Sequence, residues 1–165
     1  MLPPKRIMSP IDFSDHSQEA LKAATQLASC FGSEIYLVHV VPAIPKLPSA
    51  ETLFHEGEYE EELHKDAEKR LAELAREVQQ KGVKTEVAVG TANDVSGELL
   101  RIAEHNHVDL IVIATHGMTG WHKLAFGSVT EKVVRLASCP VLVLRSRAVA
   151  DRTETAKADR VAVPR

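Results

Sequence analysis

Runs of β-branched and large apolar residues alternate along the chain with stretches in which apolar residues recur at helical spacing. The runs cover residues 6–11, 35–41, 85–89, 108–114 and 141–144, and most are apolar at nearly every position. A continuous apolar run is typical of a parallel strand that helices cover on both faces. Residues 85–89 instead alternate between apolar and polar side chains, which predicts a strand at an edge of the sheet.

Four segments between these runs have apolar residues three and four positions apart, as on one face of a helix. They cover residues from about 15 to 31, 58 to 80, 94 to 105 and 128 to 137. Gly32 and Gly82 follow the first two segments, where a helix often ends in a left-handed residue. The apolar positions expected on the helix faces include Phe31, Tyr59, Val134 and Leu136.

Strict alternation of five strands with four helices predicts right-handed βαβ units in an open parallel sheet, an α/β fold with helices on both faces. A chain of 165 residues is long enough for one such domain and too short for two of ordinary size. We expect the domain to cover residues 1–147. Residues 148–165 have few large apolar side chains and are expected to form a polar tail.

Composition argues against several classes of partner. The formal net charge is -3 and no basic stripe with interleaved aromatic residues is present, so we expect no nucleic-acid partner. No apolar run approaches the length of a membrane span, and the first residues lack the apolar core of a signal peptide. The two cysteines, Cys30 and Cys139, have no metal or redox spacing. These features predict a cytoplasmic protein without a membrane partner.

Two loops carry the candidate chemistry. The first strand ends in Pro10-Ile11-Asp12, and residues 114–128 join the fourth strand to the last helix. In open parallel sheets, ligands bind beyond the carboxyl ends of the strands, where the strand order reverses. If the first and fourth strands are neighbours, both loops face one crevice.

The residue types in these loops suit a nucleotide. The carboxylate of Asp12 can accept hydrogen bonds from a ribose diol. Gly117, Gly127 and the amides around Ser128, at the start of a helix, can hold phosphate oxygens.

Each residue also has a purely structural interpretation. Ser128 with Glu131 has the capping-box pattern, Asp12 can cap the next helix, and the glycines can serve turns. Because caps and turns need not converge, their joint placement on two adjacent strand ends favours the nucleotide interpretation.

Motifs of other nucleotide and phosphate proteins are missing from the sequence. It has no P-loop pattern, and no glycine-rich dinucleotide fingerprint follows the first strand. A receiver domain would need an aspartate after the third strand, where the sequence reads Val87-Ala88-Val89-Gly90. The eight histidines have no metal-ligand spacing.

Three stretches make the chain resemble the universal stress protein family from Lys5 to Leu144. They are IMSPIDFSDHS, YLVHVV and ATHGMTGWHKLAFGSVTEKVVRLASCPVLVL. Nucleotide-binding members of this family show the pattern Gly, two residues, Gly, nine residues, Gly, then Ser or Thr. Gly117, Gly127 and Ser128 match this pattern, whereas Ala114 stands in place of the first glycine.

The resemblance implies the strand order 3-2-1-4-5 and ATP, with or without Mg²⁺, as ligand. It places Pro10 and Val40 at the adenine, and Asp12 at the ribose with Ala114 beside it. The residues that would contact phosphate are Gly117, Gly127, Ser128 and Val129. It also implies a homodimer that pairs through the last strand, whose residues are Val141, Leu142, Val143 and Leu144.

These observations predict an ATP-binding stress or regulatory protein rather than a fast enzyme, because the sequence shows no group to activate water and no arginine finger. Two alternatives stay open. One is a slow ATPase or phosphotransfer protein that uses Mg²⁺ held by Asp12 or Asp15. The other is a dimeric scaffold with a vestigial site.

Overall fold

The computed structural model describes residues 3–43, 53–115 and 127–145. In this part of the chain strands and helices alternate throughout. They are β1 (Arg6–Pro10), α1 (Asp15–Phe31), β2 (Glu34–Pro42), α2 (Leu53–Gln79), β3 (Thr85–Ala92), α3 (Val95–His105), β4 (Leu110–Ala114), α4 (Ser128–Leu136) and β5 (Val141–Leu144).

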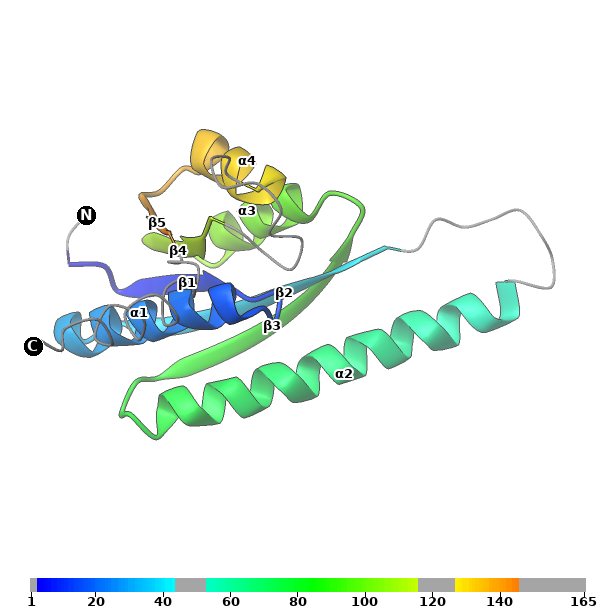
Figure 1. The fold of residues 1–165 in the computed structure, drawn as a ribbon, viewed down its shortest axis with the longest axis horizontal. Coiled ribbons are helices and arrows are strands. Elements are labelled where there is room, and N and C mark those ends of the chain that lie inside the picture. The colour runs from blue at the N-terminus through cyan, green and yellow to red at the C-terminus, as the bar shows by residue number, and fades with distance from the viewer. Residues whose placement is uncertain (1–2, 44–52, 116–126, 146–165) are drawn as a thin grey trace, which may run out of the picture.

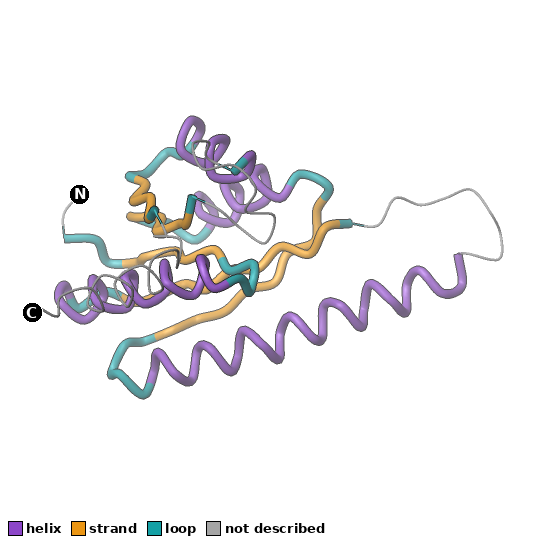
Figure 2. Tube along the Cα trace, in the orientation of Figure 1, coloured by secondary structure: helices purple, strands orange, loops and turns teal. Residues whose placement is uncertain are grey.

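The five strands form one sheet in the order β3-β2-β1-β4-β5, and every neighbouring pair is parallel (Figures 1 and 2). The predicted fold class and strand order are therefore confirmed, as is the edge position of β3. The central strand β1 pairs with β2 on one side and with β4 on the other; Ile7 lies opposite both Ile35 and Leu110. The chain first places β2 and β3 on one side of β1 and then places β4 and β5 on the other side, so the strand order reverses at β1.

Alternating side chains along the strands fill two separate cores, one on each face of the sheet. Helices α1 and α2 pack on one face and α3 and α4 on the other (Figure 1). Sheet residues in the first core include Ile7, Leu37 and Val112. Sheet residues in the second core include Met8, Val38 and Ile111. Burial on both faces explains why these strands read as continuous apolar runs.

The glycines expected to end the first two helices have left-handed backbone conformations. Gly32 has φ 69° after α1, and Gly82 has φ 81° after α2. Side chains other than glycine are disfavoured at such angles, so these positions mark the helix ends in the sequence.

Helix α2 is longer than expected. It begins at Leu53 rather than near residue 58, although it includes Gly57, a residue that disfavours helix interiors. Figure 1 shows its first turns extending past the ends of the strands, and Tyr59 is 54% exposed. The expectation that Tyr59 belongs to the buried face of this helix is therefore wrong.

Three other apolar residues expected on helix faces are also exposed. Phe31 and Leu136 are the last residues of α1 and α4, and Val134 lies on α4. Helix α4 packs on α3 and next to the edge strand β5, so the sheet covers only part of its surface. Among the described residues, no helix has the length and apolar character needed to cross a membrane.

The amino end of the central strand is held by the carboxylate of Asp109. Its Oδ2 atom accepts hydrogen bonds from the backbone N–H groups of Lys5 at 2.8 Å and Arg6 at 2.9 Å. The Asp109 N–H in turn donates to the Arg6 carbonyl at 2.9 Å. The hydrogen bond from Arg6 is the main reason why the pKa of Asp109 lies below its usual value.

We predict that Asp109→Ala lowers the free energy of unfolding by about 1–3 kcal/mol, because two backbone donors at the start of β1 lose a charged acceptor. Urea denaturation at neutral pH measures the change, with Glu104→Ala on the exposed side of α3 as the control. The lowered pKa means that this contribution is complete above the unfolded-state pKa of aspartate and is lost as the pH falls through the native value. A difference between wild type and Asp109→Ala that does not shrink in acid would contradict this assignment.

Candidate functional site

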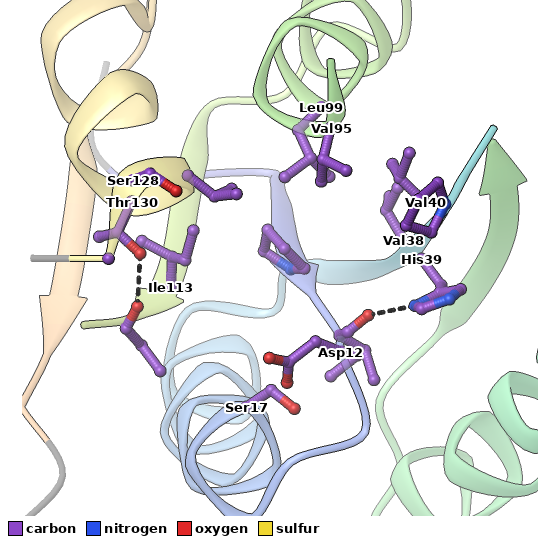
Figure 3. Close-up of a pocket in the computed structure, with 16 residues that line it drawn as sticks. Asp12, Ser17, Val38, His39, Val40, Val95, Leu99, Ile113, Ser128 and Thr130 are labelled. Carbon is purple, nitrogen blue, oxygen red and sulfur yellow. Dashed lines mark hydrogen bonds between the residues drawn. The ribbon is translucent and has the colours of Figure 1, made fainter. Parts of the chain in front are cut away.

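A cleft of about 410 Å³ lies beyond the carboxyl ends of β1, β2 and β4, where the strand order reverses (Figure 3). Its size falls within the range of small-molecule sites, about 300–1,000 Å³. The two helices that follow β1 and β4 pack on opposite faces of the sheet. The chain segments that leave these neighbouring strands therefore diverge, and the cleft opens between them.

One wall of the cleft is apolar. Val38 and Val40 project from the same face of β2, and Val95 and Leu99 lie one turn apart on α3 (Figure 3). Pro10 and Ile113 complete this wall. Of these wall residues, only Pro10 and Val40 were predicted for the site. In the sequence, Val38 is two residues from Val40, and Val95 is four residues from Leu99, so each pair lies on one face of its element. These spacings do not show which other elements the two faces contact.

Asp12 lines the cleft from the loop between β1 and α1. Its Oδ1 atom accepts hydrogen bonds from the Ser14 N–H at 3.0 Å and the Ser14 hydroxyl at 2.5 Å. The Ser14 hydroxyl also accepts from the Ser17 N–H at 3.2 Å, so Ser14 is the N-cap of α1. A carboxylate can accept about four hydrogen bonds, so bracing Ser14 and binding a ligand hydroxyl are compatible roles for Asp12.

His39, on β2, reaches the cleft from the opposite face of that strand to Val38 and Val40. Its Nδ1 atom lies 2.6 Å from the Ile11 carbonyl oxygen (Figure 3). A carbonyl oxygen only accepts hydrogen bonds, so Nδ1 carries the proton. Burial lowers the pKa of His39; the nearby Arg70 guanidinium acts in the same direction, while the Ile11 hydrogen bond and the Asp12 carboxylate oppose it. His39 is not among the residues predicted for the site from the sequence.

The opposite end of the cleft is the amino terminus of α4. The Gly127 N–H donates to the Thr115 carbonyl at 2.8 Å, and the Gly127 carbonyl accepts from Glu131 at 2.9 Å. The Thr130 hydroxyl donates to the Ala114 carbonyl at 2.8 Å (Figure 3). These bonds attach the first turn of α4 to the end of β4.

The capping box expected at Ser128 does not form. Gly127, which has no side chain to cap with, is the N-cap of α4, and Ser128 is its exposed first residue. A capping box would make Ser128 the N-cap, and the helix would then begin at Val129. Instead the helix begins at Ser128, because the Gly127 backbone makes the hydrogen bonds with Thr115 and Glu131. First-turn amides have no partner within their own helix, and among the described residues no side chain caps those of α4. They form an electropositive end at the cleft.

Gly127 has little room for a side chain. A Cβ atom at this position would lie 3.3 Å from the Thr115 carbonyl oxygen, which is tighter than ordinary contact. Its φ of −59° is ordinary for any residue. The close approach of two backbone segments, rather than an unusual backbone angle, therefore favours glycine here.

Seven of the eight residues predicted for the site line this cleft. They are Pro10, Asp12, Val40, Ala114, Gly127, Ser128 and Val129. The eighth, Gly117, belongs to residues 116–126, which lie outside the described residues, as does the predicted tail. Asp15, the other carboxylate considered for Mg²⁺, is exposed and is not a lining residue. Within the described ranges, no group of three or more His, Cys, Asp or Glu side chains could hold a metal ion.

The cleft thus has three parts in sequence: an apolar wall, a carboxylate and a helix amino terminus. Asp12 and His39 are the ionisable side chains among its described lining residues. Such an arrangement can bind a flat apolar ring, hydroxyl groups and an anion at successive positions along one ligand. An open parallel α/β domain with a ligand cleft at the reversal of strand order is the class of protein that the fold and the site define.

The chain belongs to the universal stress protein family, whose model matches residues 3–145. Universal stress protein MJ0531 of Methanocaldococcus jannaschii is 36% identical over 148 residues, which cover 86% of this chain and 82% of that protein. The solved structure of protein MJ0577 from the same organism superposes with a TM-score of 0.76 at 28% identity, over 87% of this chain and 96% of the other.

A universal stress protein from Archaeoglobus fulgidus, solved in complex with dAMP, also has this fold. Its TM-score is 0.59 at 20% identity, over 87% of this chain and 98% of that one.

We predict that the wild-type protein loses more stability between about pH 7.5 and about pH 5.5 than the variant His39→Asn. The pKa of His39 is lowered in the native state, so the unfolded chain binds more protons in this range and acid favours unfolding. The contribution of neutral His39 is complete above the unfolded-state pKa of about 6.5 and is lost as the pH falls toward the native value.

Urea denaturation at both pH values measures the effect. Asparagine places an N–H donor near the position of Nδ1 but does not titrate, so the hydrogen bond to Ile11 is preserved. Equal losses of stability in wild type and variant would show that His39 does not contribute to the acid sensitivity.

Proposed function

We propose that the cleft binds an adenine nucleotide, with ATP as the ligand, and that the protein is a cytoplasmic stress or regulatory protein that responds to this nucleotide. The observation that carries the proposal is the order of the three parts of the cleft. The apolar wall, the Asp12 carboxylate and the amino terminus of α4 match the order of base, ribose and phosphates along a nucleotide.

The base would lie against the apolar wall. Val40 is 6% exposed and Leu99 is 3% exposed, so both are largely fixed by their packing before any ligand arrives. Branched side chains on a strand facing others on a helix leave a flat slot, and a purine ring buried there would add apolar contact. Pro10, at the end of β1, would border this slot.

The ribose would lie at Asp12. A carboxylate is unsuited to phosphate, because like charges repel, but it accepts well from a vicinal diol. Ala114 also lines the cleft and would lie beside the ribose. The pattern of the nucleotide-binding family members has glycine at this position.

The phosphates would lie at the amino terminus of α4. The amides of Ser128 and Val129 and the Ser128 hydroxyl are donors there, and the helix dipole favours an anion. Gly127 allows the backbone to approach closely, and Gly117 is proposed as a further phosphate contact. The described lining residues offer Mg²⁺ one carboxylate, Asp12, while nucleotide-bound Mg²⁺ takes most of its ligands from phosphate and water. Binding should therefore be measured with and without Mg²⁺.

The comparisons support this proposal at the level of the family and the fold. A relative of the same fold was solved in complex with dAMP, which carries the three chemical parts that the cleft would bind. Both cysteines of the chain are free, in agreement with a reducing compartment.

We predict that Asp12→Asn weakens ATP binding by about tenfold to a hundredfold, because hydrogen bonds from the ribose to a charged acceptor are lost. Asparagine keeps an oxygen for the bonds from Ser14, so the loop conformation is preserved. Isothermal titration calorimetry on the full chain measures the dissociation constant.

Asp15→Asn is the matched control, because it makes the same chemical change three residues away at an exposed position outside the cleft. It should leave ATP binding unchanged. A wild-type protein that does not bind ATP, with or without Mg²⁺, would refute the proposed function. Equal binding by wild type and Asp12→Asn would refute the assignment of the ribose position.

We also propose that two copies pair through β5. This strand is at the edge of the sheet, and its outer side has no neighbouring strand within the described part of the chain. Leu142, in the middle of the strand, is 40% exposed. An apolar edge strand of this kind needs a cover, which a second copy of the same strand would supply.

We predict that Leu142→Lys raises the dissociation constant of the dimer by about tenfold or more, because it places like charges in a buried contact. Light scattering coupled to size-exclusion chromatography at several concentrations measures this shift. Phe31→Lys, which changes an exposed apolar residue on α1, serves as the control and should leave the dimer intact. Dimers of unchanged stability in Leu142→Lys would rule out β5 as the interface.

A further inference from the structure

The residue that follows Asp12 has an unusual backbone conformation. Phe13 has a φ of 63°, in the left-handed region, although a bulky side chain disfavours that region. Strained residues of this kind persist only where surrounding contacts hold them, and they are concentrated at functional sites. The contacts of Phe13 therefore indicate what holds the Asp12 loop in place.

Two side chains from distant parts of the chain contact the Phe13 ring. The guanidinium carbon of Arg70, on α2, lies 3.8 Å from the ring centroid. The ring of His39, on β2, has its centroid 4.7 Å away and is tilted by 44°. We refer to these three residues as the Arg70–Phe13–His39 cluster.

The same cluster holds the residue on the other side of Asp12. The carbonyl of Ile11 lies 2.6 Å from His39 Nδ1, and the N–H of Ile11 donates to the Val38 carbonyl at 2.8 Å. Both neighbours of Asp12 are thus held against β2, one through its backbone and the other through its ring. These two attachments determine the direction in which the Asp12 side chain projects from the backbone.

Arg70 also forms an ion pair with Asp66, one turn earlier on the same helix, at 3.6 Å. Both side chains are exposed, and ion pairs of that kind contribute little. The contact with Phe13 is different, because it connects α2 to the loop between β1 and α1. Arg70 itself does not line the cleft.

We propose that the Arg70–Phe13–His39 cluster positions Asp12 for the ribose hydroxyls, so that α2 affects which nucleotide is selected without touching it. Arg70 and Phe13 are positioning residues in this arrangement. The inference rests on the proposed function, since it assumes that a nucleotide occupies the cleft with its ribose at Asp12.

The test compares the affinities of the full chain for ATP and for dATP, which lacks one ribose hydroxyl. The variant is Arg70→Gln, and the control is Arg76→Gln, which changes another exposed arginine of α2. A cation–π contact at an exposed site corresponds to an effect of about two- to fivefold. Arg70→Gln should reduce the preference for ATP over dATP by that factor, while Arg76→Gln should leave the preference unchanged.

A double-mutant cycle separates positioning from general destabilisation. In the background of Asp12→Asn, the further change Arg70→Gln should have no effect on the preference, because the group that it positions is already altered. Phe13→Gly gives a second route. Glycine adopts the left-handed conformation without strain, so this variant removes the ring and leaves the backbone angle accessible, and it too should lower the preference.

The possible outcomes separate the positioning role of the cluster from the nucleotide site itself. A wild type that binds ATP and prefers it to dATP, with the preference intact in Arg70→Gln and Phe13→Gly, overturns the positioning role and leaves the nucleotide site standing. An equal effect of Arg70→Gln with and without Asp12→Asn overturns it as well. A wild type that binds neither nucleotide refutes the proposed function and this inference together.

Discussion

The position of β1 between β2 and β4 is the constraint on which the cleft depends. The chain places β2 and β3 on one side of β1 and β4 and β5 on the other, so the strand order reverses at the carboxyl end of β1. The helices that follow β1 and β4 then cover opposite faces of the sheet. Two adjacent strands therefore send their chains apart at the same edge, and a crevice opens whatever side chains line it. Asp109 contributes by holding the other end of β1.

The polar groups of the cleft are anchored by hydrogen bonds that also build the fold. Asp12 accepts from Ser14, which caps α1, and the first turn of α4 is attached to β4 through Gly127 and Thr130. Residues that are held in this way lose little freedom when a ligand binds. The loop around Asp12 is held in the same way, because β2 and α2 contact the residues on each side of Asp12.

Local sequence patterns are reliable where the burial of an element repeats along the chain. The buried strands and the edge strand β3 were recognisable because burial on one or both faces leaves a direct periodic signal. Tyr59 follows the helical spacing of apolar residues and is nevertheless exposed. Such spacing does not show how far the sheet under the helix extends. Ser128 has the local pattern of a capping box, but the box does not form. The hydrogen bond from Gly127 to the Thr115 carbonyl makes Gly127 the N-cap instead. Val38 lies in the apolar run of residues 35–41 and Leu99 in the helical segment of residues 94–105, and these patterns do not indicate the wall of a cleft.

The alternation of strands and helices, the left-handed ends at Gly32 and Gly82, and the family are all evident from the sequence alone. Each of them depends on neighbouring residues or on a long specific stretch. The meeting of the apolar faces of β2 and α3 at the end of β1, and the contact of Arg70 with Phe13, are seen only in the folded chain. Such contacts join elements far apart in the chain, and they depend on how the helices dock on the sheet. No local periodicity records that docking, since one amphipathic face can pack against many surfaces.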